Sequence, residues 1–153
     1  MQTSAATDSK TYWIVVADES AAVVFGQERR NGPLISLFSL DNPEARKHTG
    51  ELLSDRGGRA FDSHGQGRHT MAKEKEGPKR HLATVFAKEI AEKIAHAMHD
   101  GSCRGYALIA APRFLGLLRD AVATNVKDGP FTTIDKDVVG KDAKFIEELL
   151  AGS

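Results

Sequence analysis

Residues 54–69 constrain the fold of this chain more than any other segment. These sixteen residues contain four glycines, three arginines, two histidines and two aspartates, with Phe61 as the one large apolar side chain. Glycines weaken helices and strands, and they allow backbone conformations that other residues avoid. The polar groups of such a segment need water, one another or a ligand as partners. A long loop of this composition within a compact domain is typical of a functional or a disordered segment.

The residues on both sides of this segment predict an α/β domain. We expect strands at residues 12–17, 21–27, 34–40, 106–110 and 131–135, and helices at residues 78–100, 112–122 and 141–151. Turn signals at Asp18-Glu19-Ser20 and Asn31-Gly32-Pro33 separate the first three strands, which should form an antiparallel meander, and Asp41-Asn42-Pro43 closes the third strand. Helices then alternate with strands, so the first, fourth and fifth strands should run parallel.

The expected fold class is therefore α/β, with a mixed five-stranded sheet and helices on its faces. The element order βββαβαβα is that of the ribonuclease H-like fold, with a long Gly/Arg-rich loop at residues 41–77 between the third strand and the first helix. We expect residues 1–10 to be a disordered N-terminal tail and residues 11–153 to form a single domain, because 153 residues suit one core.

Composition excludes several classes of protein. The net charge is zero, and 41% of the residues are hydrophobic, as in an ordinary soluble domain. The single cysteine, Cys103, forms no internal disulfide and fits a reducing compartment. The sequence shows no signal peptide and no apolar stretch of membrane-spanning length. We therefore expect a cytoplasmic protein with no membrane partner, and the sequence leaves its oligomeric state open.

Positive charge is concentrated around the glycine-rich segment. Residues 46–81 hold nine lysines and arginines against five acidic residues, a local excess of four positive charges. Arginine forks suit phosphate or carboxylate, and glycines let backbone N–H groups approach an oxyanion. The candidate ligand-binding residues are Asp18, Arg56, Gly58, Arg59, Asp62, Ser63, His64, Gly65, Gly67, Arg68, His69 and Arg113. The alternative is that Arg56 and Arg59 pair with Asp55 and Asp62 and only order the loop.

Several motifs together resemble a known family. They are Trp13-Ile-Val-Val-Ala-Asp18, Glu51-Leu-Leu-Ser-Asp-Arg56, Gly58-Arg-Ala-Phe-Asp-Ser63, Gly65-Gln-Gly-Arg-His69 and Ala110-Ala-Pro-Arg-Phe-Leu-Gly116. The chain resembles, from about Tyr12 to its C-terminus, the bacterial family named protein required for attachment to host cells. That name describes a phenotype and supplies neither a reaction nor a ligand.

The family is in turn similar to the central domain of eukaryotic and archaeal class-1 peptide-chain release factors. That domain has the same element order, and its Gly-Gly-Gln loop lies between the third strand and the first helix. This chain reads Gly57-Gly58-Arg59 and Gly65-Gln66-Gly67 at the corresponding point, so the tripeptide is missing. The resemblance implies an RNA or ribosome partner by analogy, while peptide release is not expected.

Catalytic interpretations have less support from the sequence. Asp18 matches the first carboxylate of a two-metal nuclease, but the fourth strand ends in Ala110-Ala111-Pro112, where a second acid is needed. Asp62, His64 and His69 match no strong metal-binding spacing. Adjacent Asp62, Ser63 and His64 point in different directions on an extended segment, so a catalytic triad is not expected. We expect neither a metal nor another cofactor.

The sequence thus favours a non-enzymatic cytoplasmic binding domain that engages an anionic partner, RNA or the ribosome, through the Gly/Arg-rich loop. One alternative is a hydrolase of a phosphate ester or an ester that uses Asp18, Asp62 or His69. Another is a protein-interaction module whose loop becomes ordered on its partner.

Overall fold

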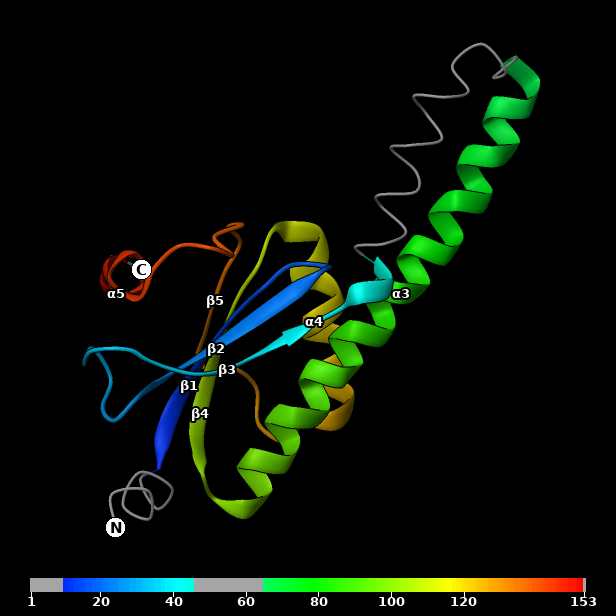
Figure 1. The fold of residues 1–153 in the computed structure, drawn as a ribbon. Coiled ribbons are helices and arrows are strands. Elements are labelled where there is room, and N and C mark those ends of the chain that lie inside the picture. The colour runs from blue at the N-terminus through cyan, green and yellow to red at the C-terminus, as the bar shows by residue number, and fades with distance from the viewer. Residues whose placement is uncertain (1–9, 46–64, 153) are drawn as a thin grey trace.

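The computed structural model describes the backbone of residues 10–45 and 65–152, and the side chains of residues 10–45 and 77–152 (Figure 1). The elements in chain order are β1 (Thr11–Ala17), β2 (Ala21–Gln27), β3 (Ile35–Asp41), α3 (Gly65–Asp100), β4 (Cys103–Ile109), α4 (Pro112–Asn125), β5 (Thr132–Ile134) and α5 (Ala143–Ala151). The expected α/β class is confirmed.

The described strands form one mixed, open sheet of five strands in the order β3-β2-β1-β4-β5. β1, β2 and β3 are antiparallel neighbours, whereas β1, β4 and β5 run parallel, both as expected. The parallel strands all end on the same side of the sheet, beside residues 18–21, 41–45 and 110–113. We call this side the carboxyl end of the sheet. The opposite side, where the strands β1 and β4 begin, carries the β2–β3 connection, residues 27–34, and we call it the hairpin end.

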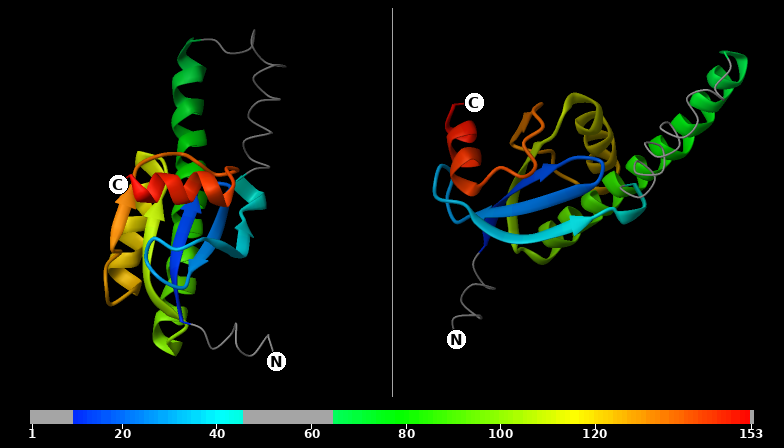
Figure 2. Two further views of the ribbon diagram at one scale, coloured as in Figure 1. Left: turned by 90° about the vertical axis from the view of Figure 1, so that its left-hand side faces the viewer. Right: turned by 45° about the horizontal axis from the view of Figure 1, so that its top comes forward.

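Helices cover both faces of the sheet and create two apolar layers (Figures 1 and 2). Alternate residues of a strand point to opposite faces, so Trp13 and Val15 of β1 pack toward α3 and α4, while Ile14 and Val16 face α5. Trp13 is buried, and its ring packs edge to face against the Phe38 ring, with the two ring centroids 5.3 Å apart. The apolar neighbours of Trp13 in the sequence predict a core position, and its burial confirms this.

Only part of α3 packs on the sheet. The helix has 36 residues and is about 54 Å long, whereas a seven-residue strand spans about 24 Å. Its buried residues recur every three or four positions at Ala83, Phe86, Ala87, Ile90, Ala91, Ile94 and Ala97. The N-terminal half extends past the carboxyl end of the sheet (Figure 2). The helical spacing of apolar residues in the sequence predicts that Val85 is buried with them, but it is 49% exposed.

The prediction of a loop over residues 41–77 is wrong at the two ends of this range, which the structure describes. Residues 43–45 are helical, and α3 already begins at Gly65, so that Pro78 lies inside the helix. In the sequence, Gly77-Pro78 predicts a helix start at residue 78, because proline suits the first helical turn. Residues 71–76 are all strong helix formers, and they carry the helix through this point although Pro78 donates no backbone hydrogen bond.

Candidate functional site

Asp18 shapes the turn that joins β1 to β2 at the carboxyl end of the sheet. Its Oδ1 accepts hydrogen bonds from the backbone N–H of Ser20 at 2.8 Å, the Ser20 hydroxyl at 3.0 Å and the backbone N–H of Ala21 at 2.9 Å. The Asp18 N–H donates to the Ala21 carbonyl at 2.8 Å and closes the turn. Asp18 therefore has a structural role, and its role as a ligand group stays a prediction.

Asn42 ties the end of β3 to this turn and to α3. Its backbone N–H donates to the Ser20 carbonyl at 2.8 Å. Its side-chain Nδ2 donates to the carbonyl oxygens of Glu19 at 3.1 Å and of Leu82 at 3.4 Å. The chain thus leaves the sheet after β3 at a point held against both the β1–β2 turn and α3.

The start of α4 lies beside the same stretch of α3. The rings of Phe86 and Phe114 stack with their centroids 6.2 Å apart, and Phe86 lies one turn beyond Leu82. Ala111 is the N-cap residue of α4 and has no polar side chain to accept from the first-turn N–H groups. The exposed Arg113 immediately precedes Phe114. Ordinary packing therefore brings Arg113 to the place where α3 leaves the sheet.

Charge is divided across this end of the sheet. The side formed by the turns and by the end of β3 carries Asp18, Glu19, Asp41 and Glu44, whereas the side formed by α3 and α4 carries Lys79, Arg80 and Arg113. In the described part of the chain, Lys79 and Arg80 form no ion pair. An anionic partner would accordingly be attracted to the helical side, and repelled by the turn side.

The structure brings some of the predicted site residues to this end. Asp18 and Arg113 lie there, whereas Gly65, Gly67, Arg68 and His69 belong to the first two turns of α3, which project beyond this end of the sheet (Figure 2). The other predicted residues, Arg56, Gly58, Arg59, Asp62, Ser63 and His64, lie outside the described residues. The alternative pairing of Arg56 and Arg59 with Asp55 and Asp62 lies outside them as well.

Asp135 is a further carboxylate at the carboxyl end, and it is not among the residues that the sequence analysis selected. It directly follows β5, and β4 separates it from Asp18, because Val16 is in register with Ile109 and Ile109 with Ile134. Among the residues whose side chains are described, no three His, Cys, Asp or Glu residues are grouped so as to hold a metal ion. None of the described helices is long and apolar enough to cross a membrane.

The sequence predicts that Cys103 lies in a short connection before the fourth strand, whereas in the structure it opens β4 at the hairpin end. Its thiol is buried and donates to the Gly105 carbonyl at 3.3 Å. Burial raises the pKa of the thiol to about 11, because the thiolate loses its hydration. A protonated, buried thiol of this kind is a poor nucleophile at neutral pH.

Sequence reasoning missed the polar residues of the hairpin end. Gln27 is the buried polar residue of β2, and Arg30 stacks over the ring of Phe131 with 3.8 Å from its guanidinium carbon to the ring centroid. Both residues line hollows between the β2–β3 connection and α5. The sequence offers only a weak signal for this site, namely a glutamine at the end of an otherwise apolar strand.

Comparison with known proteins identifies the family. No curated protein matches the sequence. A family model described as protein required for attachment to host cells matches residues 13–150, which include every described strand except the start of β1, and all of the helices but the last residue of α5. The chain therefore belongs to the family of proteins required for attachment to host cells.

Proposed function

We propose that this member of the host-attachment family is a non-enzymatic cytoplasmic domain that binds RNA, on or near the ribosome, at the carboxyl end of its sheet. The binding surface comprises the Gly/Arg-rich segment, the N-terminal half of α3 and Arg113. The likeness to release-factor central domains and the ribonuclease H-like fold are parts of the same proposal. The strand order β3-β2-β1-β4-β5, with β2 alone running against its neighbours, supports them.

One observation carries this proposal. The bonds of Asn42 to Glu19 and Leu82 anchor the chain, just before residue 46, beside the exit of α3 from the sheet. The Phe86–Phe114 stack places Arg113 at the same exit. The positively charged part of the sequence, residues 46–81, therefore both starts and finishes at a single end of the fold.

The division of charge makes the proposal more specific. Phosphate groups would contact α3 and the start of α4, because the turn side carries carboxylates. Arginine and lysine contacts with phosphate release counterions, so affinity should fall steeply with salt concentration. Backbone N–H groups of the uncapped first turn of α4 would add to the attraction for an anion.

Equilibrium binding of a short single-stranded RNA, measured over a series of salt concentrations, tests the proposal. The double substitution Arg59→Ala/Arg68→Ala should weaken binding and reduce the slope of log affinity against log salt by about two. Lys79→Ala/Arg80→Ala should act in the same direction, and Arg113→Ala should reduce the slope by about one.

Arg119→Ala is the matched control for Arg113→Ala, because Arg119 is also exposed on α4 but lies farther from its start. The control should bind RNA as the unchanged chain does. Equal affinity for all variants at low salt, or an affinity that does not depend on salt, would overturn the RNA proposal. Cleavage of the RNA or of an ester by the unchanged chain, lost in Asp18→Asn, would favour the hydrolase alternative.

A further inference from the structure

The hairpin end contains a divided hollow that the proposed function does not use. One part has a volume of about 450 Å³ and the adjoining part about 350 Å³, and both are bounded by Gln27, Asn31, Leu150 and Ala151. Glu147, Gly32 and Pro33 complete the first part, and Arg30, Phe131 and Thr132 complete the second. Each volume lies in the range typical of small-molecule sites.

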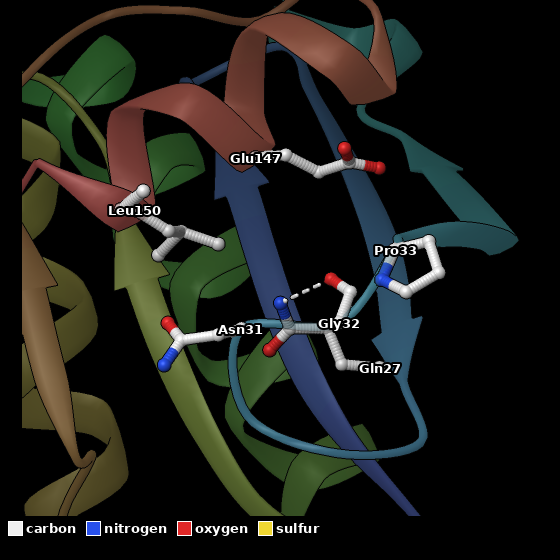
Figure 3. Close-up of a pocket in the computed structure, with 7 residues that line it drawn as sticks. Gln27, Asn31, Gly32, Pro33, Glu147 and Leu150 are labelled. Atoms are coloured by element: carbon white, nitrogen blue, oxygen red, sulfur yellow. Dashed lines mark hydrogen bonds between the residues drawn. The ribbon is translucent and has the colours of Figure 1, made fainter.

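Gln27 brings a buried acceptor to this hollow. The residue is only 3% exposed, and its Nε2 donates a hydrogen bond to the Gly32 carbonyl at 3.0 Å. Because Gly32 offers an acceptor, the amide nitrogen must face it, and Oε1 is turned to the other side, toward Asn31 (Figure 3). No described residue donates to that oxygen. A buried carbonyl oxygen without a donor is costly, so this oxygen needs a donor from water or from a ligand in the hollow.

Glu147 adds negative charge to the same part of the hollow. Its Oε2 accepts a hydrogen bond from the backbone N–H of Leu34 at 2.9 Å, which fixes the carboxylate above the β2–β3 connection (Figure 3). No described residue donates to Oε1. A carboxylate accepts several hydrogen bonds, so Glu147 can hold Leu34 and a ligand at once. An acceptor and a negative charge together favour an ammonium group.

Arg30 gives the second part of the hollow the opposite charge. Its guanidinium group lies over the Phe131 ring at 3.8 Å and within 5.9 Å of the Tyr12 ring. Stacking of this kind fixes the plane of the guanidinium group and leaves its N–H edge for an anion. Within the described residues, no carboxylate lies within ion-pair distance of Arg30. The neighbouring Asn31 contributes a further amide.

From this charge pattern we infer that the hollow binds a small aliphatic zwitterion, an amino acid or a short peptide. The ammonium group of the ligand lies at Glu147, its carboxylate lies at Arg30, and Gln27 Oε1 adds a neutral acceptor on the side of Asn31. Pro33, Leu150 and Ala151 supply the apolar contacts for an aliphatic side chain. This site lies at the opposite end of the sheet from the proposed RNA surface, and it does not depend on that proposal.

Calorimetric titration with leucine and with the dipeptide leucyl-leucine tests the inference and distinguishes the two sources of the zwitterion. N-acetyl-leucine lacks the ammonium group, and leucinamide lacks the carboxylate. We expect leucine or its dipeptide to bind, and both blocked compounds to bind at least about tenfold more weakly. Equal binding of a blocked compound, or no binding of either zwitterion up to about 10 mM, would overturn the inference.

Two substitutions with matched controls locate the site. Glu147→Gln keeps an oxygen acceptor for Leu34 and removes the charge, and the control Glu148→Gln alters the exposed neighbour on α5. Arg30→Gln removes the anion partner, and Arg29→Gln is its control in the same turn. We expect each test variant to lose about tenfold in affinity for the zwitterion and each control to retain it. Test variants that bind as tightly as their controls would place the ligand elsewhere.

Discussion

The two ends of the sheet use their polar side chains in different ways. At the carboxyl end, Asp18 and Asn42 direct their hydrogen bonds to backbone groups of the turns and of α3. At the hairpin end, Gln27 and Glu147 each satisfy one backbone group and keep an oxygen atom for the adjoining hollow. The first end is built to hold a segment that projects from the fold, and the second is built to receive a small molecule.

The largest expected effect on stability is at Asp18. Asp18→Ala removes an acceptor that serves three donors, and we expect the free energy of unfolding to fall by about 2 kcal/mol. Asp135→Ala is the control at the same end, because no hydrogen bond to Asp135 forms among the described residues, and it should change stability by less than about 0.5 kcal/mol. Urea unfolding measures both. Equal effects would mean that the turn does not depend on Asp18.

Cys103 makes stability at the hairpin end sensitive to alkaline pH. Burial in the folded chain raises the pKa of this thiol to about 11, well above its ordinary value, so folding favours the protonated form. Its contribution to stability is complete below about pH 9 and is lost as the pH rises toward 11.

Urea unfolding should therefore show that the free energy of unfolding declines between about pH 8 and about pH 10.5. The decline should be smaller in Cys103→Ala. Alkylation of the folded chain by iodoacetamide at pH 8 should also be slow, because little thiolate is present. Rapid alkylation of the folded protein would contradict the burial of this residue.

A smaller effect is expected at Asn31. This residue adopts φ +69°, a conformation that costs most side chains about 1 kcal/mol and that asparagine and glycine tolerate best. Asn31→Ala should lower the free energy of unfolding by about 1 kcal/mol, whereas Asn31→Gly should leave it nearly unchanged. Thermal unfolding of both variants tests this, and an alanine variant as stable as the glycine variant would contradict the left-handed turn.

The strands and the layers of the fold could be predicted from the sequence, whereas the lengths of its helices could not. The apolar run from Trp13 to Ala17 is enough to indicate a buried strand. The turn residues Asp41-Asn42 are enough to indicate where the third strand ends. The start of α3 was missed because Pro78 suggested a boundary, while the helix-forming residues before it outweigh that signal. Local signals compete, and a sequence does not show which prevails.

The two ends also differ in how far the sequence revealed them. Arg113 was predicted because Pro112 marks the start of a helix after a strand, where ligands often bind. The role of Gln27 depends on Gly32 and on a carboxylate more than a hundred residues away in α5, and no local pattern records such a contact. Sites that form where distant segments meet become visible only after the chain has folded.

Amide chemical shifts of the labelled full chain, titrated at low salt with a short single-stranded RNA and separately with leucine, test the contrast between the two ends most directly. We expect RNA to shift the resonances of Ser20, Asn42, Arg113 and the first turns of α3, and leucine to shift those of the Gln27 side-chain amide and of Gly32. RNA-induced shifts confined to residues 27–34, or none at the carboxyl end, would contradict the central claim that this end holds a segment for an anionic partner.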